Sequence, residues 1–69
     1  MKKYYVDTTK IYEDVCGWAQ TKDELEEWTL EKLREELETI DFPDDENGYT
    51  LDELSELYYD AVQKLISEI

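Results

Sequence analysis

The chain has 69 residues, which is one domain or less, and its 20 acidic residues outnumber 7 basic ones, so the formal net charge is −13 without any histidine. The hydrophobic fraction of 41% is higher than that of an acidic disordered tail, and no apolar run approaches the roughly 18–20 residues that span a bilayer. The negative charge argues against nucleic acid or an anionic membrane as a direct partner.

The first predicted elements are a short extended segment and a helix. Residues 2–7 combine aromatic and β-branched side chains, which favour an edge strand. Apolar residues then recur at helical spacing over 9–19, although Gly17 costs such a helix about 1 kcal/mol relative to alanine. The alternative is a β-hairpin that pairs residues 3–7 with residues 14–19. We prefer the helix.

A second helix is predicted over 22–40. Thr21 and Glu24 have the spacing of a capping box, which starts the helix. Thr29 either caps a new helix or continues the first one. The apolar residues of the following turns share one face: Leu30, Leu33, Leu37 and Ile40.

The last helix, over 51–68, has the clearest pattern. It follows a loop over 41–48 whose proline, acids and Asn-Gly pair are typical of turns, and Thr50 with Glu53 forms a second capping box. Its apolar stripe contains Leu51, Leu54, Leu57, Tyr58, Ala61, Val62, Leu65 and Ile69. The sequence therefore predicts one mainly α domain over 1–69, a compact bundle of about three helices after a short extended N-terminal segment. An α+β fold with an N-terminal β-hairpin is the alternative.

Charge is distributed unevenly along the chain. Residues 1–12 have a net charge of +2, whereas residues 13–60 hold 18 acids against Lys22, Lys32 and Arg34, a net charge of −15. Self-repulsion of this size destabilises a compact state. We therefore expect a compensating benefit, either in binding or in solubility.

The acidic residues predict a partner-binding surface. If residues 22–40 form one helix, five glutamates lie along one face over about 21 Å, a charge spacing comparable with that of phosphates along a DNA strand. A second acidic group continues through the loop onto the last helix, where Tyr59 adds an aromatic side chain suited to an interface. The predicted surface consists of Glu24, Glu27, Glu31, Glu35, Glu38, Asp44, Asp45, Glu46, Asp52, Glu53, Glu56 and Tyr59.

Residues with the chemistry of catalysis are scarce. The chain lacks histidine, Cys16 is expected to be a buried small residue, and a glycine-rich phosphate loop is absent. The acidic loop does not fit an EF-hand, because Gly48 at position 6 of that motif puts Pro43 at position 1 and Leu54 at position 12. We predict no enzymatic activity, no metal and no cofactor, with a weak, irregular divalent-cation site as an alternative.

Two pairs of segments are similar to an antirestriction family. Asp-Phe-Pro at 41–43, followed by Tyr-Thr-Leu-Asp-Glu-Leu at 49–54, is similar to a stretch of ArdA proteins, and Tyr-Tyr-Val at 4–6 with Gly-Trp at 17–18 resembles the opening hairpin of that family. By size, charge and helical content the chain also resembles small acidic DNA mimics of phages and mobile elements, a class that includes anti-CRISPR proteins. The resemblance implies a protein that occupies the DNA-binding groove of a defence nuclease.

The sequence thus predicts a cytoplasmic DNA-mimic inhibitor whose partner is a basic, nucleic-acid-binding protein or nuclease. One alternative is an adaptor that binds through the aromatic and apolar surface of the last helix. Another explanation is that the acidic face only keeps the protein in solution. A homodimer through Leu65, Ile66 and Ile69 is also compatible with so small a core, and no membrane contact is expected.

Overall fold

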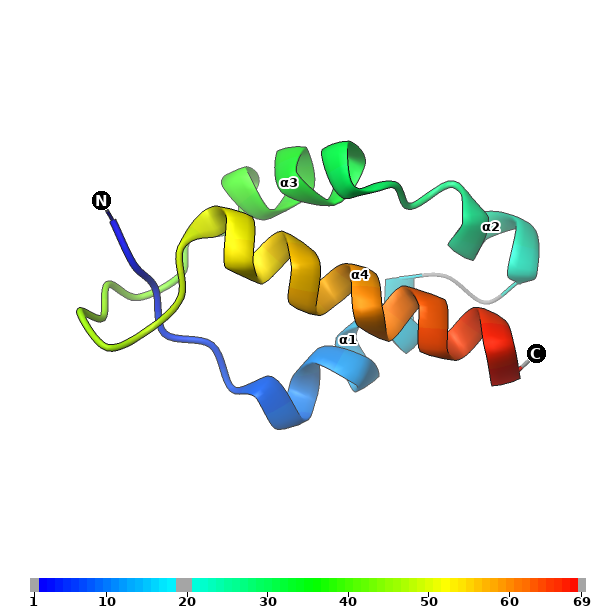
Figure 1. Cartoon of the computed structure of the whole chain (residues 1–69), viewed down its shortest axis with the longest axis horizontal. Coiled ribbons are helices and arrows are strands. Elements are labelled where there is room, and N and C mark those ends of the chain that lie inside the picture. The colour runs from blue at the N-terminus through cyan, green and yellow to red at the C-terminus, as the bar shows by residue number, and fades with distance from the viewer. Residues whose placement is uncertain (1, 19–20, 69) are drawn as a thin grey trace.

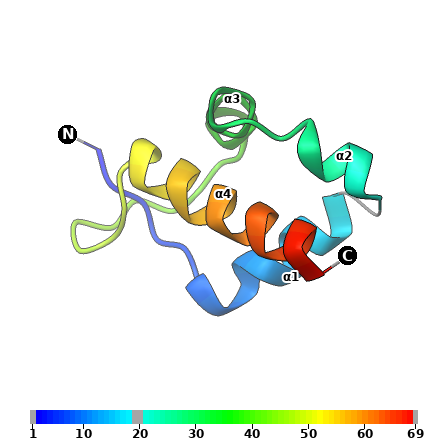
Figure 2. The same cartoon turned by 45° about the vertical axis from the view of Figure 1, so that its right-hand side comes forward.

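The last helix is the central element of the fold. The computed structural model describes residues 2–18 and 21–68, which form η1 (Thr8–Lys10), α1 (Ile11–Trp18), α2 (Lys22–Glu26), α3 (Leu30–Thr39) and α4 (Leu51–Glu68). α1 lies on one side of α4, and α2 and α3 lie on the other side, in both views of the molecule (Figures 1 and 2). The predicted mainly α fold is confirmed.

The core lies where α1, α2 and α3 meet α4. α4 has a broad apolar stripe because it must pack against helices on both of its sides. The Trp18 ring stacks on the Tyr58 ring at 5.2 Å between centroids and lies 5.5 Å from the centroid of the Trp28 ring. These aromatic contacts connect α1, α4 and the segment between α2 and α3. The buried apolar side chains are Ile11, Val15, Leu25, Leu33, Leu37, Leu54, Tyr58, Ala61, Val62 and Leu65.

The single helix expected over 22–40 is divided in two. The backbone of Thr29 is extended, with φ −82° and ψ 167°, and its side-chain hydroxyl accepts a hydrogen bond from the Lys32 amide at 3.2 Å. Thr29 therefore acts as an N-cap that starts α3. The break allows Leu25 and Leu33, from two differently directed segments, both to be fully buried against the core.

The N-terminal segment is extended, but it pairs with the acidic loop and not with residues 14–18, which are helical. The Tyr4 amide donates to the Tyr49 carbonyl at 2.8 Å, and the Tyr49 amide donates back to the Tyr4 carbonyl at 2.9 Å. The alternative N-terminal hairpin is therefore wrong. Tyr4 lies between the two arms of the loop, because it also forms an antiparallel bridge with Asp44.

The first helical region begins slightly earlier than predicted, with the 3₁₀ turn η1 preceding α1. Asp7 caps it, because its carboxylate accepts from the Thr9 amide at 3.0 Å and from the Thr9 hydroxyl at 2.6 Å. Val15 is buried, whereas Cys16 is exposed, so the expected burial of the cysteine is wrong. Ala19, the last residue of the predicted helix, lies outside the described residues.

The last helix has the predicted extent, and its N-terminus has the predicted capping box. The Thr50 hydroxyl accepts from the Glu53 amide at 3.3 Å, and the Glu53 carboxylate accepts from the Thr50 amide at 3.1 Å. Of the residues suggested for a homodimer, Leu65 is buried, Ile66 is half-buried, and Ile69 lies outside the described residues. None of the helices in residues 2–18 and 21–68 combines the length and the apolar character that a membrane span requires.

Candidate functional site

The outer sides of α3 and α4 carry one part of the predicted acidic surface. Leu33 and Leu37 are buried, so the other side of α3 faces outward. Glu31, Glu35 and Glu38 lie within about 60° of one another on that helix, at 100° per residue. All three glutamates are exposed, and so are Asp52 and Glu56 on α4. We call these five residues the α3–α4 acidic face.

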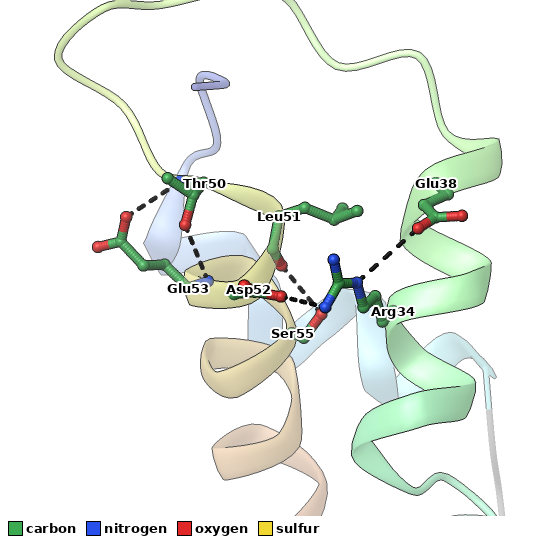
Figure 3. A network of polar contacts seen from close by, with 7 residues as sticks. All are labelled: Arg34, Glu38, Thr50, Leu51, Asp52, Glu53 and Ser55. Atoms are coloured by element: carbon green, nitrogen blue, oxygen red, sulfur yellow. Dashed lines mark hydrogen bonds and ion pairs between the residues drawn. The ribbon is translucent and has the colours of Figure 1, made fainter. Parts of the chain in front are cut away.

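Arg34 joins the two helices across this face (Figure 3). Its Nη1 atom lies 2.5 Å from Oδ1 of Asp52, and its Nε atom lies 3.8 Å from Oε1 of Glu38. The side chains of this network are more than half exposed, so each ion pair contributes about 0–1 kcal/mol to stability. Arg34 thus neutralises part of the acidic face, a role that was not predicted from the sequence. The i, i+4 spacing of Arg34 and Glu38 is the feature of the sequence that could have predicted their ion pair.

A groove of about 320 Å³ lies between α3 and α4 beside this ion pair. Carboxylates from both helices line the groove, together with the Arg34 side chain. Leu30, which is 43% exposed, gives it an apolar wall. Ser55 also lines the groove, but its hydroxyl donates to the Leu51 carbonyl at 2.9 Å. Leu30 was predicted on one helix face with Leu33 and Leu37, which are buried, and the groove was not predicted from the sequence.

Glu53, another predicted partner-binding residue, has a structural role at the start of α4. Its hydrogen bonds with Thr50, first from the backbone amide of Thr50, hold the pKa of this carboxyl below its usual value. The same bonds close the first turn of α4 (Figure 3). A partner that drew Glu53 away would therefore also uncap the central helix.

The acidic loop is partly neutralised by the basic N-terminal segment. Lys2 forms an ion pair with Asp44 at 3.6 Å, and the Asp45 amide donates to the Lys3 carbonyl at 3.0 Å. The Asp45 carboxylate accepts from the Asn47 amide at 3.0 Å. A depression of about 290 Å³ between the two segments is lined by Lys2, Lys3, Asp44, Asp45 and Glu46. The loop acids therefore face lysines of their own chain, apart from the α3–α4 acidic face.

The remaining predicted residues lie elsewhere. Glu24 belongs to α2 and Glu27 is its C-cap, so the break before α3 removes them from the helix that carries the other three glutamates. Tyr59 is half-buried and packs against the core. Lys32 places its ammonium 4.9 Å from the centroid of the Trp28 ring. The predicted line of five carboxylates on one helix is therefore wrong, and three of them remain in line.

Metal-ligand geometry is also lacking in the part of the chain that the structure describes. Among residues 2–18 and 21–68, no three side chains of the His, Cys, Asp and Glu types come together as a group that could hold a metal ion.

Comparison with known proteins gave no match among family models, curated proteins or solved structures.

Proposed function

We propose that the chain is a DNA-mimic inhibitor that covers the nucleic-acid-binding surface of a basic protein, such as a bacterial defence nuclease. The observation that carries this proposal is the α3–α4 acidic face, with carboxylates exposed on two packed helices. Both ion pairs found there among the described residues use the same cation, Arg34. Carboxylates in this arrangement can meet the lysine and arginine side chains that otherwise hold phosphates.

The charge pattern of α3 supports a role beyond helix stability. A glutamate on an exposed helix gains about 0.2–0.5 kcal/mol from a lysine or arginine four residues away, and a like charge there costs a similar amount. Glu31 instead has Glu35 at that position. Other pairs on α3, such as Arg34 with Glu38 and Lys32 with Glu36, have the favourable spacing. The Glu31–Glu35 pair thus costs the helix some stability and adds to a negative surface that steers a basic partner toward it.

In this function the chain acts by binding alone. It competes with nucleic acid for one surface, performs no catalysis and needs no cofactor. The proposed target is a cytoplasmic protein, so the inhibitor acts in the cytoplasm. An adaptor that binds through Tyr59 has less support, because this side chain is half-buried against the core.

The test is an affinity capture from bacterial lysate at 50 and 500 mM salt, with and without excess duplex DNA. We expect a nucleic-acid-binding protein that both DNA and salt release, because charge-dominated contacts weaken as ions screen them. A partner that resists both DNA and salt would contradict the proposal.

A matched pair of double variants locates the contact. Glu31→Lys with Glu35→Lys reverses two charges on the α3–α4 acidic face, and we expect it to abolish capture of the DNA-competed protein. Glu13→Lys with Glu26→Lys makes the same change in net charge at exposed positions of α1 and α2. We expect the control to retain most of the binding. Equal losses in both variants would show that only net charge matters.

A further inference from the structure

The groove between α3 and α4 combines an apolar wall with acidic sides. Leu30 is 43% exposed at the start of α3, although the other leucines of that helix are fully buried. Glu31 lines the groove from α3, and Asp52 and Glu56 line it from α4. With Arg34 included, three carboxylates and one guanidinium give the groove a net charge of −2. Its chemistry is therefore complementary to a cation carried beside an apolar side chain.

Arg34 shows that a guanidinium fits at this place. It reaches from α3 to α4 and lies 2.5 Å from the Asp52 carboxylate, with its side chain still 53% exposed. Arg34 occupies Asp52 and leaves Glu31 and Glu56 on the groove without an ion pair to any described residue. A second guanidinium thus has two carboxylates available, one from each helix.

Two other depressions of the molecule already contain a cation of the same chain. The one beside the acidic loop already contains Lys2 and Lys3 of the same chain. The one between α1 and α4 is lined by Lys64, whose ammonium lies 5.3 Å from the Tyr12 ring, and its one acidic residue is Asp60. A depression on the other side of Glu56 has three carboxylates and no cation, but its Glu53 is already held by hydrogen bonds with Thr50. Among these four depressions, the α3–α4 groove combines carboxylates from two helices with an exposed leucine.

From these contacts we infer that the α3–α4 groove docks an amphipathic helix of the partner, with an arginine one turn away from an apolar residue. The arginine pairs with Glu31 and Glu56, and the apolar residue packs on Leu30. A helix is suited to this groove because residues three or four apart lie about 5–6 Å from each other on one face, and helices pack in grooves between helices. This inference rests on the proposed function for the class of partner, and adds the contact that anchors it.

The direct test uses a stapled helical peptide with one arginine and one leucine a turn apart, in an alanine and glutamine background. Its binding to the full chain is followed by amide chemical shifts at 50 mM salt. We expect shifts concentrated at Leu30, Glu31, Ser55 and Glu56, and a loss of binding when glutamine replaces the arginine of the peptide. Shifts centred on the acidic loop or spread over the whole surface would overturn the inference.

Variants of the chain separate the groove from general charge. Glu31→Gln with Glu56→Gln removes both available carboxylates, and we expect the peptide to bind at least about tenfold more weakly, the usual effect of losing charge-assisted hydrogen bonds. Leu30→Ser keeps the net charge and changes an exposed side chain, so the fold should persist while binding weakens severalfold. The control, Glu13→Gln with Glu26→Gln, should bind within about twofold of the parent chain. Equal weakening by the two double variants would refute a specific groove.

The same variants distinguish this inference from the proposed function. If Leu30→Ser and Glu56→Gln capture the DNA-competed protein normally while Glu31→Lys with Glu35→Lys does not, DNA mimicry stands and the groove is not its anchor. If the peptide depends on the groove residues but DNA never releases the captured protein, the groove stands and DNA mimicry falls.

Discussion

The two glycines of the chain have opposite surroundings. A Cβ atom added at Gly17, in α1, would meet no atom within 4 Å, whereas one added at Gly48 would overlap the backbone carbonyl of Tyr4. Gly48 is therefore needed for the close approach between the acidic loop and the N-terminal segment. Gly17 only adds conformational entropy to the unfolded chain.

Replacing Gly17 by alanine should stabilise the protein. We expect Gly17→Ala to raise the free energy of unfolding by up to about 1 kcal/mol, because alanine is the better helix former and its Cβ has space. Urea denaturation followed by circular dichroism measures the change. A destabilised variant would show that the backbone at residue 17 is not helical in solution.

Replacing Gly48 by alanine should do the reverse. The added Cβ forces apart the Tyr4–Tyr49 pair of hydrogen bonds, and overpacking of this kind costs about 1–3 kcal/mol. Denaturation by urea measures the loss, and amide hydrogen exchange at Tyr4 and Tyr49 locates it. Unchanged exchange at both amides would contradict the pairing of the two segments.

Tyr12 should be the residue with the most distinctive titration. Its hydroxyl donates a hydrogen bond to the Glu68 carboxylate, and this bond, together with desolvation and the negative charge of Glu68, raises the pKa of Tyr12 to about 12. Between the ordinary tyrosine pKa of about 10 and this value, the unfolded chain releases the proton and the folded chain keeps it. The stabilising effect is therefore complete below pH 10 and is lost by about pH 12.

Phenolate absorbance tests this expectation. In the Tyr12→Phe variant, the titration step near pH 12 should disappear, and the loss of stability between pH 10 and 12 should become shallower. Tyr5→Phe, at a tyrosine that is 55% exposed, is the control and should leave that step in place. Persistence of the step in Tyr12→Phe would assign it to another tyrosine.

At the scale of elements, the break at Thr29 shows what could and could not be read from the sequence. The spacing of apolar residues was enough to predict α4 and the helical nature of the segment over 22–40, because a long stripe has few other solutions. Whether Thr29 caps or continues a helix depends on how Leu25 and Leu33 pack on α4, which is a tertiary effect. Local pattern was therefore compatible with both outcomes.

The acidic face shows the same limit at the candidate site. The outward positions of Glu31, Glu35 and Glu38 follow from the helical period around Leu33 and Leu37, so they were predictable. The pairing of Arg34 with Asp52 joins two helices that a loop separates, and the contact between the basic N-terminal segment and the acidic loop spans some 40 positions. Such contacts need the packing of the whole chain.

The Thr29 cap should be worth a measurable part of the stability. Thr29→Ala removes the acceptor for the Lys32 amide, and we expect a loss of about 1 kcal/mol, the usual cost of removing an N-cap. Thr29→Ser keeps a hydroxyl acceptor and is the matched control, expected within about 0.5 kcal/mol of the parent. Urea denaturation compares the three proteins. A stabilised Thr29→Ala variant would mean that α2 and α3 join into one helix in solution.

At the scale of the whole molecule, negative charge dominates the electrostatics. The net charge is −13, and the structure measures 36 × 22 × 16 Å. The described residues contain three ion pairs, all between exposed side chains. Each of them contributes so little to the free energy of folding that its screening by salt destabilises the protein only slightly. Most repulsive pairs across a molecule of this size are separated by more than the Debye length of about 10 Å at 0.1 M salt. Screening therefore relieves more repulsion than attraction.

We accordingly expect the thermal midpoint to rise by about 5–10 °C between 20 and 500 mM sodium chloride, which for a domain of this size corresponds to about 1–2 kcal/mol. A triple variant that replaces Glu26, Glu35 and Glu36 with glutamine should melt higher at 20 mM salt and respond less to added salt. A midpoint that falls with salt would show that the ion pairs outweigh the repulsion.

A bound basic partner should relieve the same repulsion. A ligand that binds only the folded state raises the midpoint, and the rise grows with its affinity. If the partner binds through the α3–α4 acidic face, its affinity is highest at low salt, where the free protein is least stable. The rise caused by the partner should therefore be large at 20 mM salt and small at 500 mM salt, as differential scanning fluorimetry of the captured pair can measure. An equal rise at both salt concentrations would point to an apolar interface and away from the carboxylates.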